Sequence, residues 1–98
     1  MEKRELAKKI AALRPSLEAE GVQHIALFGS RARGTHRSDS DIDVLVEVAD
    51  DARFSILNLI GVEHLVSDAT GLTANAVMRR SLASSMKAEV TKDLVEIF

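Results

Sequence analysis

The chain has 98 residues, 46% of them apolar and 29% charged, a composition ordinary for one small globular domain. No apolar run approaches the roughly 20 residues of a membrane span, the first residues lack the apolar core of a signal peptide, and the absence of cysteine excludes disulfides and thiolate metal sites. The formal net charge of −2 argues against broad, nonspecific binding of nucleic acid. We therefore expect one domain over residues 1–98, in a cytoplasmic protein that contacts neither membrane nor nucleic acid directly.

The first predicted element is a helix over residues 2–20. Apolar residues recur there at helical spacing among charged ones: Leu6, Ile10, Leu13 and Leu17. Pro15 interrupts the pattern, so we expect either a kink or a break after which Pro15 opens a second short helix. Gly21 is a plausible stop for the helix.

Two strands are predicted on either side of a polar loop. Residues 23–28 form the first, because Ile25–Phe28 is apolar on both faces, as in a central strand that is covered on each side. A short helical turn follows at residues 30–34, and then a loop at 35–40. Residues 41–48 form the second strand, whose core face consists of Ile42, Val44, Val46 and Val48.

A helix is predicted over residues 53–68, with Asp50 or Asp51 as its N-cap and Gly71 closing it. Its apolar side is expected to consist of Phe54, Leu57, Ile60, Gly61 and Leu65.

The last two predicted elements are a weaker strand at residues 72–78 and a helix that Ser81 caps and that runs to about residue 97. Apolar residues step by four along that helix: Leu82, Met86, Val90, Leu94 and Phe98. The predicted fold class is α/β (α+β), a three-stranded mixed sheet with helices in the order α-β-α-β-α-β-α.

Chemistry concentrates between Gly29 and Asp43. Side chains on a strand alternate between faces, so Asp41 and Asp43 project to the same side of the second strand. Two carboxylates held that close repel each other unless they are protonated or bridged by a cation. Gly29 permits a close approach of the backbone, and Ser30 offers a hydroxyl and an N–H where a helical turn begins, which favours phosphate. The stretch therefore predicts a metal-and-phosphate site.

Three segments carry a family resemblance: Gly29-Ser30, Arg31-Ala32-Arg33-Gly34, and Ser40-Asp41-Ile42-Asp43-Val44-Leu45-Val46. Together they resemble the signature of the DNA polymerase β-like nucleotidyltransferase superfamily, and most closely its minimal nucleotidyltransferase group, whose members are often encoded beside HEPN-domain partners. The resemblance covers nearly the whole chain.

The resemblance implies the small nucleotidyltransferase fold and assigns roles to individual residues. Gly29 and Ser30 would hold the phosphates of a nucleoside triphosphate, and Asp41 and Asp43 would bind Mg²⁺. In this family one metal ion activates the attacking hydroxyl, and the other neutralises the triphosphate and the leaving pyrophosphate.

This sequence departs from the family pattern at the third carboxylate, which the family carries on the next strand. An alignment without gaps from Phe54 places Asn75 at that position, and asparagine is an uncharged, poorer ligand that cannot act as a base. Glu47 lies on the same strand face as the two aspartates but further along, and Glu63 or Asp68 would require a shorter middle helix. Whether one of them substitutes stays open, as does whether the protein turns over.

Basic residues follow the Gly-Ser pair, namely Arg31, Arg33, His36 and Arg37. They are either solvated loop charges or contacts for triphosphate or an acidic partner surface; Arg33 is the candidate phosphate ligand among them. His24 and His64 have no ligand partner at metal-binding spacing, so we expect them to be structural or exposed.

Two functions are compatible with these residues. The resemblance implies an antitoxin-type protein that transfers AMP from ATP to a hydroxyl of a HEPN-type partner, with Mg²⁺ as cofactor. Asn75 favours the alternative, a catalytically impaired module that binds nucleotide and neutralises its partner by binding alone. The sequence leaves the acceptor, the nucleotide preference and the oligomeric state open, and a homodimer is among the options.

Overall fold

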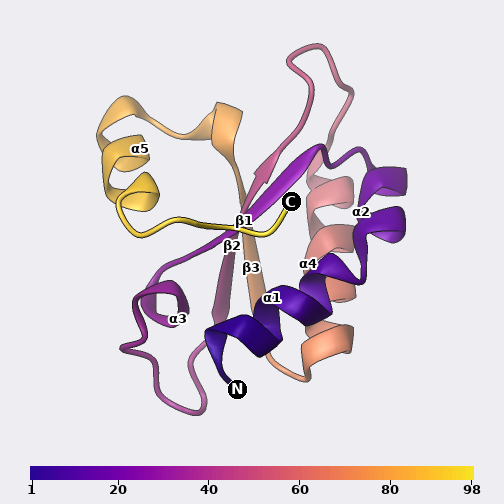
Figure 1. Cartoon of the computed structure of the whole chain (residues 1–98). Helices are drawn as coiled ribbons and strands as arrows, with labels where there is room; N and C mark the ends of the chain where they lie inside the picture. Colours follow the sequence, from indigo (N-terminus) through magenta and orange to yellow (C-terminus); the bar gives the residue numbers. More distant parts are fainter.

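The computed structural model describes residues 1–98 and consists of a four-stranded mixed sheet with helices around it (Figure 1). In chain order the elements are α1 (Lys3–Ala11), α2 (Arg14–Glu20), β1 (His24–Phe28), α3 (Ser30–Arg33), β2 (Ile42–Glu47), α4 (Ile56–Thr70), β3 (Ala74–Met78), the 3₁₀ helix η1 (Arg79–Ser81), α5 (Ser84–Thr91) and β4 (Val95–Glu96). The sheet order is β3-β2-β1-β4, and only the β2–β3 pair is parallel. The α+β class predicted from the sequence is confirmed, with one more strand than expected.

The N-terminal helical segment is broken rather than kinked. α1 ends at Ala11, and Pro15 lies in the first turn of α2, where the missing N–H of proline costs nothing. Gly21 ends α2 in a left-handed conformation with a φ of 109°, as its position predicted.

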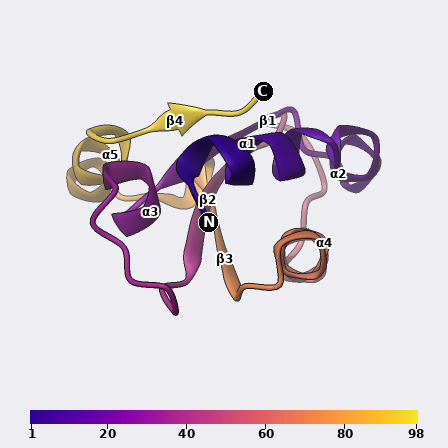
Figure 2. The same cartoon turned by 60° about the horizontal axis from the view of Figure 1, so that its bottom comes forward.

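One face of the sheet is buried beneath α1, α2 and α4, whereas α3 and α5 lie on the other side of the strands in Figure 1, apart from each other (Figure 1, Figure 2). The alternation along β2 explains the core: Ile42, Val44, Val46 and Val48 all point to the helices and are buried, as predicted. The same alternation turns Asp43 and Glu47 to the other face.

The C-terminal segment corrects the sequence prediction. The last helix ends at Thr91 instead of about residue 97, and β4 follows it and pairs antiparallel with β1. Pairing satisfies the backbone at the free edge of β1, and the β-branched Val95 and Ile97 pack against the core, which a continued helix would prevent. The predicted cap Ser81 instead ends η1, and Ala83 is the residue that precedes α5.

The start and the buried face of α4 also differ from expectation. Ser55, not Asp50 or Asp51, is the N-cap, because Ser55 and Asn58 form a reciprocal capping box. The helix buries Val62, Val66 and Thr70, while Leu57 is 75% exposed. Of the predicted apolar side, Phe54 is buried in the core and Leu65 packs against it, whereas Leu57 and Ile60 are exposed. An apolar stripe in a sequence does not say which side of the helix meets the sheet.

α4 also covers the outer edge of β3. Ser67 Oγ accepts the N–H of Ala74 at 3.0 Å, and Glu63 Oε2 accepts the N–H of Ala76 at 2.8 Å. These bonds occupy the donors that an edge strand would otherwise present for pairing with another chain.

No helix is both long and apolar enough to cross a membrane.

Candidate functional site

The site begins where β1 ends, at Gly29. This glycine has φ 76° and ψ −157°, a region that is essentially restricted to glycine. A Cβ added there would lie 2.5 Å from Asp43 Oδ2 and 3.3 Å from Asp43 Cγ. Both the backbone conformation and the available space therefore require glycine, and its absent side chain lets the carboxylate of β2 pass over the turn.

Three polar side chains meet on the open face of the sheet beside that turn. Asp41 directly precedes β2, which begins one residue later than predicted, and Asp43 is the second residue of that strand. Asn75 is the register partner of Asp43 on the parallel strand β3. Asn75 Nδ2 donates a hydrogen bond to Asp41 Oδ2 at 3.1 Å. Asn75, which the alignment placed at the third carboxylate position of the family, therefore lies next to Asp41 and Asp43.

The fold changes the acidity of Asp43. Partial burial raises the pKa of Asp43 above its ordinary value of 3.8, and the negative charge of Asp41 raises it further. The Asn75 amide, directly across the strand pair, and the positive charge of Arg33 lower the pKa, but they do not reverse the shift. The metal-free site therefore carries a carboxylate whose negative charge is disfavoured.

The donor set fits a divalent cation. Two carboxylates side by side provide the hard oxygen ligands that Mg²⁺ prefers, and a cation would relieve the repulsion that raises the pKa of Asp43. The absent Cβ of Gly29 lets Asp43 Oδ2 lie directly against the turn. Asn75 occupies the third position with an amide, and no cluster of three acidic or histidine residues is present.

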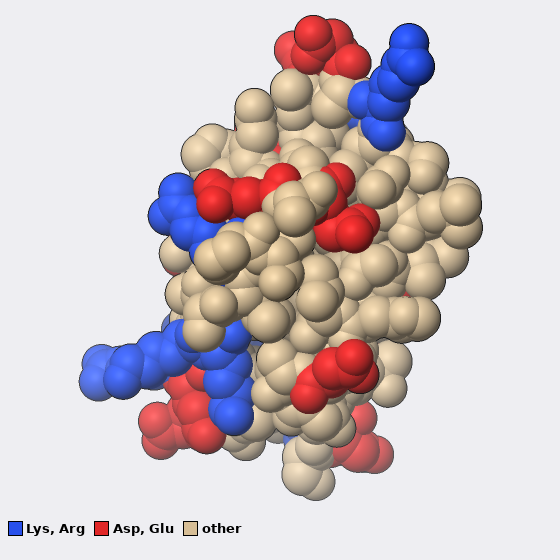
Figure 3. Space-filling model, turned by 90° about the vertical axis from the view of Figure 1, so that its right-hand side faces the viewer, with Lys and Arg blue, Asp and Glu red and all other residues tan.

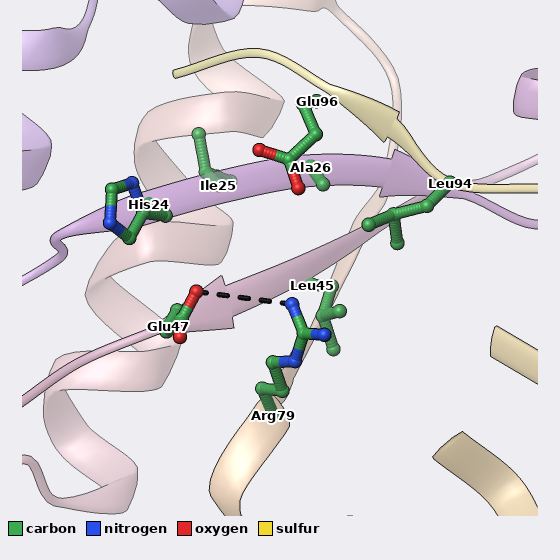
Figure 4. Close-up of a pocket in the computed structure, with 8 residues that line it drawn as sticks. All are labelled: His24, Ile25, Ala26, Leu45, Glu47, Arg79, Leu94 and Glu96. Atoms are coloured by element: carbon green, nitrogen blue, oxygen red, sulfur yellow. Dashed lines mark ion pairs between the residues drawn. The ribbon is translucent and has the colours of Figure 1, made fainter. Parts of the chain in front are cut away.

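None of the three candidate substitutes brings a third carboxylate to the site. Glu47 lies four residues beyond Asp43, about 13 Å further along the strand, where it faces Arg79 at 3.9 Å in a separate cavity (Figure 4). Glu63 is bonded to the outer edge of β3. The exposed Asp68 lies on α4, against the opposite face of the sheet.

The cavity in Figure 4 does not enlarge the candidate site. His24 and Glu96 line it together with the Glu47–Arg79 pair, but its volume is about 10 Å³, roughly one water molecule. His64 is exposed on α4, as expected.

The arginines of the Gly-Ser segment divide into two kinds. Arg33 is exposed, approaches Asp93 Oδ2 at 3.7 Å, and is near enough to Asp43 to lower its pKa. Arg31 does not belong to an exposed basic loop. It is only 1% exposed, and its guanidinium donates to backbone carbonyls of residues 37–40. Sequence reasoning missed this role because nothing in the local pattern distinguishes the two arginines.

Comparison with known proteins places this geometry in a family. Residues 4–97 match the nucleotidyltransferase domain family. The chain is 35% identical over 80 residues to the protein adenylyltransferase MntA of Thermococcus cleftensis. The aligned region covers 82% of this chain and 79% of that protein.

Solved structures share the fold. One, assigned to the minimal nucleotidyltransferases, superposes with a TM-score of 0.79 at 25% identity over 97% of this chain and 95% of its own. Another is a tri-AMPylated HEPN toxin of Shewanella oneidensis in complex with an MNT antitoxin; the match has a TM-score of 0.66 at 19% identity over 94% of this chain and 71% of the matched chain. The chain therefore belongs to the nucleotidyltransferase domain family, in its minimal nucleotidyltransferase group.

Proposed function

We propose that this protein transfers AMP from ATP, with Mg²⁺, to a hydroxyl of a HEPN-type partner protein and thereby acts as its antitoxin. The observation that carries the proposal is the meeting of Asp41 and Asp43 with the Gly29-Ser30 turn, which would bring a cation and phosphates together. Two comparisons support it: a relative named as a protein adenylyltransferase, and a fold neighbour that is an antitoxin bound to an AMPylated HEPN toxin.

Each residue has a defined part in the proposed reaction. Asp41 and Asp43 hold the cation, Gly29 and Ser30 bind the phosphates, and the exposed Arg33 contributes positive charge beside them. A bound divalent cation neutralises charge on the triphosphate and the leaving pyrophosphate. In the proposed step the hydroxyl oxygen of the acceptor forms a bond to the α-phosphorus, the bond from the α-phosphorus to the pyrophosphate oxygen breaks, pyrophosphate leaves, and the hydroxyl proton passes to solvent water.

A binding-only antitoxin is the second candidate, and two observations favour it. The amide of Asn75 stands where the family carries a third carboxylate, so the site lacks the charge for two closely spaced cations. In addition, Ile56, Leu57 and Ile60 form an exposed apolar stripe on α4. Figure 3 views the side on which α2 and α4 lie: acidic side chains cross the middle of this face, and an area without charged side chains lies beside them. Exposed apolar residues that lie together on a surface can mark an interaction site.

The direct test incubates the protein with Mg-ATP and its HEPN-type genomic neighbour, followed by intact-mass measurement of the neighbour. Added AMP that disappears with Asp43→Ala supports transfer. If no AMP is added with Mg²⁺ or Mn²⁺, the transferase proposal fails. Inhibition of the toxin that survives Asp43→Ala then identifies the binding-only antitoxin.

A further inference from the structure

Arg31 is the one charged side chain in the buried set, and all its bonds go to one loop. Its Nε donates to Ser40 O at 3.0 Å, and one terminal nitrogen, Nη2, lies 3.3 Å from Ser38 O and 3.5 Å from Arg37 O, the last at the long limit for a hydrogen bond. The other terminal nitrogen, Nη1, is buried without a partner.

The burial of the Arg31 guanidinium lowers the free energy of unfolding rather than raising it. None of the ion pairs includes Arg31, so a full positive charge is buried against neutral carbonyls, and one of its donors is unsatisfied. Burying an unpaired charge opposes folding even when its hydrogen bonds are good. Stability by itself would be served as well by an apolar residue of similar size.

The loop that Arg31 binds leads directly into Asp41 and the strand that carries Asp43. Residues 37–40 form a tight turn in which Ser40 N donates to Arg37 O and Arg37 N donates to Ser40 Oγ. The hydrogen bonds that connect residues 36–40 to the rest of the protein all come from Arg31. The shortest hydrogen bond of Arg31, at 3.0 Å, goes to Ser40 O, which belongs to the peptide unit that joins Ser40 to Asp41.

We infer that Arg31 is a positioning residue for Asp41: its planar guanidinium fixes the 37–40 turn so that the Asp41 carboxylate stands beside Asp43 to bind the cation. A lysine in its place keeps the positive charge but cannot reach several carbonyls at once from a rigid fork. The inference rests on the proposed metal site but does not require that the protein transfer AMP.

The test measures Mn²⁺ affinity in the presence of a non-hydrolysable ATP analogue, by electron paramagnetic resonance of free Mn²⁺, with a protein-free titration of the analogue as the reference because the triphosphate itself binds Mn²⁺. Arg31→Lys should bind Mn²⁺ between about 10- and 100-fold more weakly, the usual effect of removing a group that orients a metal ligand. In the Asp41→Asn background the same substitution should cause no further loss, because the ligand that it positions is already gone.

Arg80 provides a matched control. It also donates to backbone carbonyls of one loop, at Ala49, Asp50, Ala52 and Phe54, but that loop joins β2 to α4 and leaves the opposite end of β2 from Asp41. Arg80→Lys should therefore lower thermal stability while Mn²⁺ affinity stays unchanged. Equal losses of affinity in both variants would show general loosening and overturn the inference.

Two further outcomes decide the matter if Arg31→Lys fails to fold. In the wild-type protein, the NMR signal of the Arg31 Nε–H should be protected from solvent exchange and should shift when Mg²⁺ and the ATP analogue bind; a signal that does not respond overturns the inference. A wild-type protein that binds no Mn²⁺ overturns it too. Mn²⁺ binding that depends on Arg31, without any AMP transfer, overturns only the transferase proposal.

Discussion

A Cβ atom on Gly29 would lie 2.5 Å from Asp43 Oδ2, a distance that real Cβ atoms essentially never show. The turn after β1 and the strand β2 are therefore in contact at one carboxylate, and this contact brings the proposed phosphate and metal ligands together. Any side chain at residue 29 would displace Asp43 or the turn.

Gly29→Ala should abolish binding of Mn²⁺ with a non-hydrolysable ATP analogue, because the added methyl group occupies the place of the Asp43 carboxylate. Gly34→Ala is the control: Gly34 also has a positive φ, 79°, but an added Cβ meets nothing within 4 Å. Its left-handed backbone should cost about 1–2 kcal/mol of stability, and Mn²⁺ binding should persist. Wild-type Mn²⁺ affinity in Gly29→Ala would contradict the proposed site.

Asp43 should destabilise the metal-free protein at neutral pH. Its folded-state pKa lies above the ordinary 3.8, so the folded state binds the proton more tightly, and stability is lost as pH rises from about 3.8 through the folded pKa. Asp43→Asn removes this loss. In thermal unfolding without metal, the variant should be the more stable protein at pH 7, and its advantage should shrink toward zero below pH 3.8, where Asp43 is neutral in both states. A variant less stable at pH 7 would show that the carboxylate is favourably bound.

Asn75→Asp should restore the three-carboxylate arrangement. The new charge would face Asp43 across the parallel strand pair and would also replace the amide that donates to Asp41. We expect Mn²⁺ stoichiometry with the ATP analogue to rise from one ion per chain to two, and AMP transfer to rise about tenfold or more, equivalent to about 1.4 kcal/mol of barrier. Asn75→Ser is the control that removes the amide without adding charge. Two ions bound by the wild-type chain would refute this prediction.

Leu57→Glu should weaken binding to the HEPN-type partner if the apolar stripe of α4 is the interaction surface. Leu57 is 75% exposed, so its replacement should change the free energy of unfolding by no more than about 0.5 kcal/mol, while a contact at the centre of an interface costs about 1 kcal/mol or more. Met86→Glu, at a 55% exposed apolar residue on α5, is the matched control. Calorimetric titration of the partner distinguishes the two surfaces, and equal affinities would exclude the α4 stripe.

Local patterns in the sequence were enough to predict the elements that carry the site. Alternation along a β-prone run put Asp41 and Asp43 on one face, because side chains of a strand have a period of two. The Gly-Ser pair marked the end of β1, and a gap-free reading placed Asn75 beside Asp43, since the two strands pair in simple parallel register. The first two features depend on residues close together in the chain, where backbone geometry leaves few alternatives, whereas the position of Asn75 came from the alignment to the family pattern.

Tertiary structure alone decided what depends on burial and on distant partners. The periodic stripe of α4 could not reveal that Leu57 faces outward, and the spacing of the last apolar residues resembled a helix although Val95 pairs with β1. Arg31 and Arg33 look alike in the sequence, but only Arg31 turns inward to hold the loop before Asp41. Each outcome follows from which groups become desolvated together, and that is settled only when the whole chain packs.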